Sequence, residues 1–146
     1  FQTMARGIAP VPGESSARIS LVHVRDLVTA VIACLCSEAA RHQTLTLCDG
    51  KANGYDWREM ADLAGAVWGR RVRLWPVPRW LLDSLAWANL RSARLTGRAP
   101  MLTPPKLREL RHQDWVADNE LITATTGWEP AIGLRQGLDQ LRKAEL

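Results

Sequence analysis

Two apolar runs near the start of the chain set the first structural expectations. Residues 19–24 are mostly apolar and rich in branched side chains, which favours a buried β-strand. Asp26 follows and can cap a helix, since its carboxylate can accept the free N–H groups of a first turn. Residues 27–35 leave almost no polar face, so we expect a helix that other elements cover on most sides. Residues 43–48 are a second strand candidate, and the three elements together predict a parallel strand–helix–strand crossover unit.

The stretches on either side of this unit carry clear turn and cap signals. Within residues 1–18, Pro10, Pro12 and Gly13 break regular structure, which predicts a loop with a short helical end before it. A second helix is expected to open at Asp56, because Glu59 stands three residues later as in a capping box, and to end at Gly69. Residues 72–78 then predict a short edge strand that two prolines stop.

The second half of the chain is predicted to be mainly helical. The expected helices are residues 79–96 with Gly97 as their stop, one or two turns at 106–111, residues 119–126 between a cap at Asp118 and a stop at Gly127, and a last helix with Leu134, Leu138 and Leu141 on one face.

Composition places the chain among ordinary globular proteins. It has 146 residues, of which 47% are hydrophobic and 23% charged, enough for one domain with a core. No apolar run is long enough to predict a membrane span, and the start has no signal-peptide pattern, so we expect a cytoplasmic protein. The three cysteines predict reduced thiols and no metal site, since Cys34 and Cys36 would point apart on a helix.

The net charge of +4 arises mainly from a basic cluster in the middle of the chain. Its members are Arg70, Arg71, Arg73, Arg79, Arg91, Arg94, Arg98, Lys106, Arg108 and Arg111. Such a cluster can mark an anionic partner, namely a nucleotide-sugar phosphate, a nucleic acid or a membrane surface, although a solvated face explains it more often. The seven tryptophans could stack on bases, but Trp57, Trp68, Trp80 and Trp87 lie on apolar helix stripes, so core packing is predicted and no nucleic-acid partner.

Several short motifs resemble those of one enzyme family. Residues 20–27 read S-L-V-H-V-R-D-L and resemble the S-x-x-H-V-x-D-L segment of the NAD-dependent epimerase/dehydratase family, the extended short-chain dehydrogenases/reductases. Further resemblances follow in order at residues 45–50 with 55–59, at 67–70, and at 114–118 with 126–130 and 137–138. The long helix and the proline-containing loop after it look most like the steroid dehydrogenase, dihydroflavonol reductase and hopanoid-associated branches.

The resemblance implies an α/β fold that is the C-terminal portion of an extended Rossmann-type short-chain dehydrogenase/reductase, mostly helical with a few short parallel strands. Residues 1–146 would then be a single C-terminal substrate-binding region, and the N-terminal dinucleotide-binding domain would be absent from this chain. NAD or NADP is implied for the intact enzyme, and the implied substrate is a nucleotide-sugar or a sterol- or flavonoid-like hydroxy-ketone.

The chain lacks the residues that would carry the family's chemistry. No two glycines have the spacing of a dinucleotide-binding turn, so no cofactor is expected to bind this chain alone. The family's catalytic Tyr precedes a Lys by four residues, and that Lys lowers the phenol pKa. Here the only tyrosine, Tyr55, precedes Glu59, which would raise it. We therefore expect a packing role for Tyr55, no catalytic residue, and a chain that is catalytically silent alone.

Four residues remain as candidate substrate contacts. Members that use nucleotide-sugars often carry an Arg before the strand, where Arg18 stands, but Arg18 precedes His23 by five residues rather than four, which changes its face in a strand. His23 is included, although a structural histidine near the helix start is favoured. Lys106 and Arg111 rest only on charge near a proline-rich loop.

Two other functions stay open, a ligand-binding module without redox chemistry and a basic nucleic-acid-binding domain. Apolar surface left uncovered by a missing half predicts a homo-oligomer.

Overall fold

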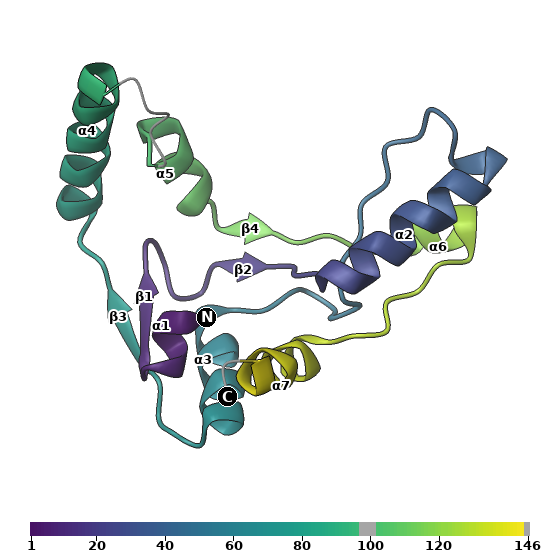
Figure 1. The fold of residues 1–146 in the computed structure, drawn as a ribbon, viewed down its shortest axis with the longest axis horizontal. Coiled ribbons are helices and arrows are strands. Elements are labelled where there is room, and N and C mark those ends of the chain that lie inside the picture. Colours follow the sequence, from purple (N-terminus) through teal and green to yellow (C-terminus); the bar gives the residue numbers. More distant parts are fainter. Residues whose placement is uncertain (97–101, 145–146) are drawn as a thin grey trace.

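The computed structural model describes residues 1–96 and 102–144, and about half of the chain is helical (Figure 1). In chain order the elements are α1 (Gln2–Ala5), β1 (Ile8–Val11), β2 (Arg18–Ile19), α2 (Val24–Cys36), the 3-10 helix η1 (Glu38–Ala40), α3 (Trp57–Trp68), β3 (Arg73–Pro76), α4 (Arg79–Thr96), α5 (Pro104–Leu110), β4 (Asp114–Trp115), α6 (Glu120–Thr126) and α7 (Leu134–Ala144).

The strands form two small parallel pairs. β1 pairs with β3, and β2 pairs with β4. The expected α/β class with a few short parallel strands is therefore confirmed, and β3 lies inside the predicted edge strand 72–78. The expectation that residues 1–18 form a loop was wrong for β1. Pro10 lies within this strand, where a two-stranded sheet tolerates a missing N–H because both strands are edges.

The helix predicted at residues 27–35 exists, but its cap is different from the one expected. α2 begins two residues before Asp26, and His23 is its N-cap, because its Nδ1 accepts the backbone N–H of Arg25 at 3.3 Å. Asp26 lies in the first turn instead and is buried. Its Oδ2 accepts the backbone N–H groups of Ala131 and Ile132 at 3.2 and 2.8 Å. Asp26 therefore fixes the connector before α7 to the start of α2.

The predicted crossover unit is wrong, because its strands do not pair with each other. The first strand is limited to Arg18–Ile19, and residues 43–48 form no strand. Asn119 occupies the backbone groups that a neighbouring strand would need: its side chain accepts from the Cys48 N–H at 2.7 Å and donates to the Cys48 carbonyl at 3.0 Å. This extended segment is thus held by the start of α6 rather than by a β-ladder.

The other predicted helices are confirmed with small shifts at their ends. In the capping box of α3, the Glu59 N–H donates to Asp56 at 2.7 Å and the Asp56 N–H to Glu59 at 3.0 Å. Gly69 ends α3 in the left-handed conformation at φ 64°. α5 starts at Pro104 after a Thr103 cap, two residues earlier than predicted, and Asn119 rather than Asp118 is the N-cap of α6. The expected stop at Gly97 lies outside the described residues.

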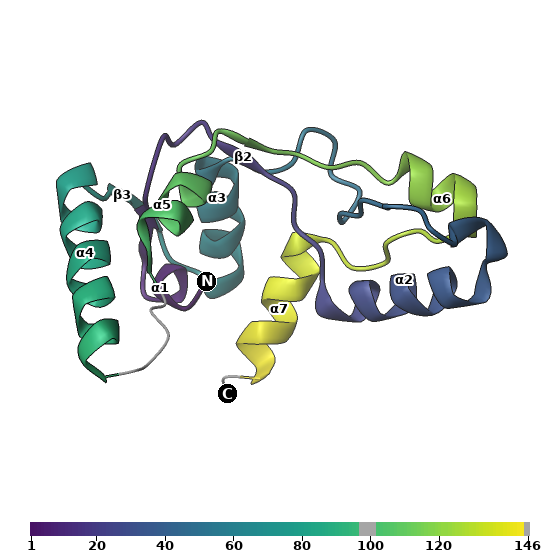
Figure 2. The same ribbon diagram turned by 90° about the horizontal axis from the view of Figure 1, so that it is seen from above.

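Two groups of buried side chains hold the molecule together. The larger group joins α1, β1, α3 and α7 and consists of Met4, Ala9, Tyr55, Met60, Ala61, Ala64, Val67 and Leu138. The smaller group, Ala30, Ile122 and Trp128, joins α2 to α6 and to the connector before α7. In both views α2 and α6 lie beside each other, away from α4 (Figures 1 and 2).

Core packing was predicted for four tryptophans and holds for two. Trp57 and Trp68 lie partly buried against the larger core. Trp80 and Trp87 on α4 are 68% and 59% exposed, so that part of the prediction was wrong. The Arg91 guanidinium lies 4.4 Å from the Trp87 ring centroid, a cation–π contact that α4 forms with its own side chains.

Candidate functional site

The first candidate substrate contact, Arg18, lies on β2 at an open depression of about 630 Å³. The depression is lined by Ser16, Arg18, Asn53, Gln113, Asp114 and Val116. The Nη1 group of Arg18 donates to the Asn53 carbonyl at 2.8 Å, which ties β2 to the loop before α3. The other guanidinium N–H groups leave Arg18 able to bind an anion at this depression.

The second candidate, His23, lines a different and smaller cavity of about 250 Å³ between the start of α2 and α7. Most of its lining is apolar, with Leu21, Leu138 and Leu141 among the residues, and Asp49 is its carboxylate. The His23 ring lies close to Gly137, where an added Cβ would come within 3.2 Å of the ring Cδ2. His23 therefore acts as a helix cap packed against α7, which confirms the structural interpretation.

The third and fourth candidates lie on or next to α5 and already have carboxylate partners. Lys106 Nζ lies 2.6 Å from Glu109, and Arg111 Nη2 lies 2.8 Å from Asp83 on α4 and also donates to the Arg79 carbonyl. Arg18 and His23 line two separate cavities of the described residues. Lys106 and Arg111 line neither of these two cavities. The four residues thus do not form one site.

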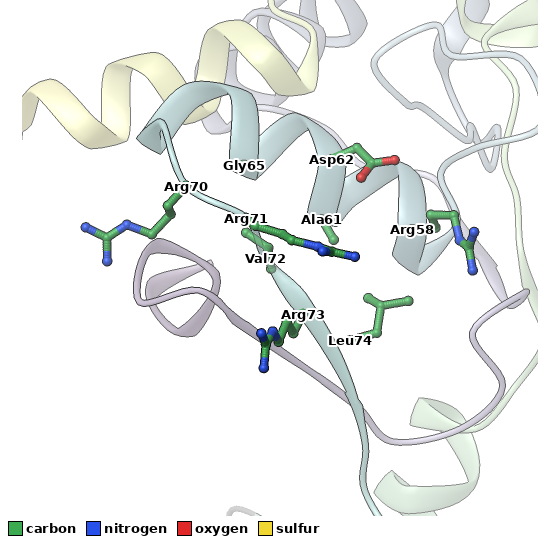
Figure 3. A pocket seen from close by; sticks show the side chains of 9 residues that line it. All are labelled: Arg58, Ala61, Asp62, Gly65, Arg70, Arg71, Val72, Arg73 and Leu74. Carbon is green, nitrogen blue, oxygen red and sulfur yellow. The ribbon is translucent and has the colours of Figure 1, made fainter.

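A cavity of about 780 Å³, larger than those that Arg18 and His23 line, contains none of the four candidate residues in its lining. It is formed by one face of α3, the loop that follows α3, and β3 (Figure 3). Four arginines line it, Arg58, Arg70, Arg71 and Arg73, together with one carboxylate, Asp62. The last three arginines belong to the predicted basic cluster. The predicted basic cluster did not include Arg58. The only sequence signal for it was its spacing from Gly65 along α3, which places both residues on the side of α3 next to the loop that follows.

Tyr55 has the packing role that was expected for it. The residue is 7% exposed in the larger core, and its hydroxyl donates to Asp49 Oδ2 at 2.6 Å. Burial raises the pKa of the phenol far above its ordinary value, and the hydrogen bond to Asp49 raises it further. A phenol held protonated in this way is a hydrogen-bond donor and not a proton acceptor near neutral pH.

The residues at the strand–helix junction do not fit a dinucleotide. In a dinucleotide-binding turn, glycine backbone N–H groups meet the pyrophosphate at the helix start. Here His23 caps that end of α2, and the buried carboxylate of Asp26 lies in its first turn, where it would repel a phosphate.

Across residues 1–96 and 102–144, no three His, Cys, Asp or Glu side chains gather as a metal site would require. Over the same residues, none of the helices has the length and apolarity to cross a membrane.

Comparison with known proteins gives a likeness in fold. No protein-family profile matches the sequence, and no curated protein matches it. Among solved structures, the chain is similar to "Structure of RMD from Pseudomonas aeruginosa complexed with NADPH", with a TM-score of 0.56 and 16% sequence identity. The match covers 94% of this chain and 37% of that one, so this chain spans well under half the length of its neighbour. The likeness shows that this chain shares its fold with part of that protein.

Proposed function

We propose that this chain is the C-terminal, substrate-binding portion of an NAD(P)-dependent epimerase, dehydratase or reductase of the extended short-chain family. In the intact enzyme a separate dinucleotide-binding half holds the cofactor. The present portion closes over that half, binds the substrate and excludes water from it. A nucleotide-sugar or a sterol- or flavonoid-like hydroxy-ketone is the proposed substrate.

One observation carries this proposal: nearly the whole chain shares its fold with part of a longer protein whose structure contains NADPH. The sequence motifs at residues 20–27, at 45–50 with 55–59, at 67–70, and at 114–118 with 126–130 and 137–138 add support, since they resemble motifs of the extended short-chain family in that family's order. The misfit of the α2 junction to a dinucleotide also supports a division of labour, in which the cofactor is bound outside this chain.

The exposed side of α2 supports the presence of a docking partner for this portion. Six of its apolar side chains are more than 40% exposed: Val24, Leu27, Val28, Val31, Ile32 and Leu35. Soluble proteins rarely leave such a continuous apolar face in water. We assign this face to contact with the cofactor-binding half of the intact enzyme.

The coding sequence that precedes the codon for Phe1 tests this proposal most directly. It should encode a strand, a glycine-rich turn and helix, and later a Tyr four residues before a Lys. A stop codon or an unrelated domain there would contradict the proposal and favour a ligand-binding module without redox chemistry.

A binding measurement on two forms of the protein gives an independent test. The protein expressed with the preceding coding sequence should bind NADPH in calorimetric titration. The 146-residue chain alone should bind neither NADPH nor NADH measurably. Micromolar binding by the short chain would mean that it contains a cofactor site of its own.

A further inference from the structure

The residues that line the depression beside α3 carry more positive than negative charge. Four arginines line it, and Asp62 is the one carboxylate among its lining residues. Within the part of the chain that the structure describes, none of these four guanidinium groups has a hydrogen-bond or ion-pair partner. Five other cationic side chains do lie within 4 Å of a carboxylate: Arg41, Lys51, Lys106, Arg111 and Arg142. The depression is thus a place where like charges gather and an anion would relieve their repulsion.

The backbone that carries these arginines is fixed on both sides. On the α3 side, the Arg70 N–H donates to the Gly65 carbonyl at 3.1 Å, and a Cβ on Gly65 would come within 2.9 Å of the Arg70 carbonyl oxygen. On the other side, the Arg73 N–H donates to the Gly7 carbonyl at 2.9 Å, and β3 pairs with β1. The positions of the Cα atoms are therefore set by the fold, and only the side chains need to adjust to a ligand.

The side chains are distributed along the depression. Figure 3 shows Arg70 at one end and Arg58 at the other, both with their guanidinium groups directed outward, and Arg71 extended between them along α3 and below Asp62. Their long side chains can rotate about the fixed backbone to bring guanidinium groups together on an anion. One guanidinium group can donate two parallel hydrogen bonds to phosphate oxygens. The cavity volume of about 780 Å³ is within the usual range of small-molecule sites.

We propose that Arg58, Arg70, Arg71 and Arg73 form a binding site for a diphosphate group, separate from the candidates Arg18 and His23. The phosphate oxygens can come from the diphosphate of a free metabolite or from neighbouring single-phosphate headgroups of an anionic lipid surface, because both present the same kind of charged oxygen. The site uses only residues of this chain, so it does not depend on the proposed cofactor-binding half.

Isothermal titration of the 146-residue chain with inorganic diphosphate, inorganic phosphate and sulfate tests the proposal. Diphosphate should bind most tightly, and binding should weaken as salt rises. The variant Arg70→Gln/Arg71→Gln/Arg73→Gln should weaken it by at least about tenfold, because each guanidinium removed takes away charge-assisted hydrogen bonds. Asp62→Asn should strengthen it severalfold by removing the opposing carboxylate.

A matched control separates a built site from overall charge. Arg25→Gln/Arg135→Gln/Lys143→Gln removes the same charge from exposed positions that do not line the depression, and it should change the affinity less than about twofold. Equal losses in the two triple variants, or no diphosphate binding by the unmodified chain, would overturn the proposal. Circular dichroism of both variants checks that they remain folded.

Vesicle sedimentation distinguishes the two sources of the phosphate groups. Phosphatidylglycerol and phosphatidylcholine vesicles serve as the anionic and neutral probes. Sedimentation with anionic vesicles that the first triple variant abolishes and the control retains supports a lipid source. Free diphosphate binding without sedimentation supports a soluble ligand. Loss of binding to single-stranded DNA in the first triple variant, with no diphosphate binding, would replace the proposal with a nucleic-acid surface.

Discussion

The larger and the smaller core differ in how far they cover their main helices, α3 and α2. α3 lies among α1, β1 and α7 and buries Met60, Ala61, Ala64 and Val67. α2 contacts α6 and η1 and buries only Asp26 and Ala30, although its sequence is the more apolar of the two. Hydrophobicity alone therefore did not tell which helix lies in the core. α3 has a polar side that faces water, while α2 has an apolar side with no cover from the described residues.

The largest expected effect comes from replacing leucine by alanine in the larger core, compared with the same replacement on α2. Leu138→Ala on α7 removes a side chain that is 2% exposed and belongs to the larger core, so it should lower the free energy of unfolding by about 3 kcal/mol. Leu35→Ala on α2 removes a side chain that is 81% exposed and should change it by less than about 0.5 kcal/mol. Urea unfolding of the two variants measures the difference. Equal losses would mean that α2 is as well covered as α7.

A second effect tests how the smaller core is attached to α7. Asp26→Ala removes the carboxylate that accepts the N–H groups of Ala131 and Ile132, so it should cost about 2 kcal/mol. Asp139→Ala is the matched control, because Asp139 is partly exposed and its ion pair with Arg142 is 3.9 Å long, so it should cost well under about 1 kcal/mol. Thermal unfolding followed by circular dichroism is the measurement. Similar melting temperatures for the two variants would contradict the bridging role of Asp26.

The same contrast explains which elements the sequence could predict. α3, α4, α6 and α7 were predicted because their signals are local: the capping box at Asp56 and Glu59, and the stops at Gly69 and Gly127. The pairing of β2 with β4 was not predictable, because Arg18 and Asp114 are far apart in the sequence and each strand has only two residues. The cap of α2 was missed because a histidine ring can accept the same N–H group as a carboxylate.

The candidate site was less predictable than the fold. Arg18, His23, Lys106 and Arg111 were chosen by resemblance and charge, and the chain places them in three different places. The arginine depression depends on how the loop after α3 turns back over Gly65, a close approach of two backbones that no residue spacing encodes. The basic cluster in the sequence indicated the positive charge of this depression. Its concave shape follows from the packing of α3, the loop after it and β3.

A third effect concerns association through the uncovered face of α2. At micromolar concentration the isolated chain should form a homodimer or a higher oligomer, because the apolar residues from Val24 to Leu35 favour contact with a second copy. Leu35→Lys/Val28→Lys should weaken association by about tenfold or more, since each places a charge in the contact. Lysines at the exposed positions Ser84 and Ala88 of α4 serve as the control with equal charge. Light scattering distinguishes them, and a monomer at all concentrations would mean that α2 tolerates water.

The smallest effect tests the packing role of Tyr55 within the larger core. Tyr55→Phe keeps the ring but removes the hydrogen bond to Asp49, so it should lower the free energy of unfolding by about 1 kcal/mol near neutral pH. The folded chain raises the phenol pKa, so the unfolded chain loses its phenol proton first, at about pH 10. The contribution of Tyr55 is therefore complete below about pH 10 and falls as the pH rises above it, by at most about 1.4 kcal/mol per pH unit. Urea unfolding at pH 8, 9.5 and 10.5 should show a steeper alkaline loss for the unmodified chain than for Tyr55→Phe, while other groups that titrate in this range act equally on both. Parallel losses would mean that the phenol titrates normally and that Asp49 and the core do not hold its proton.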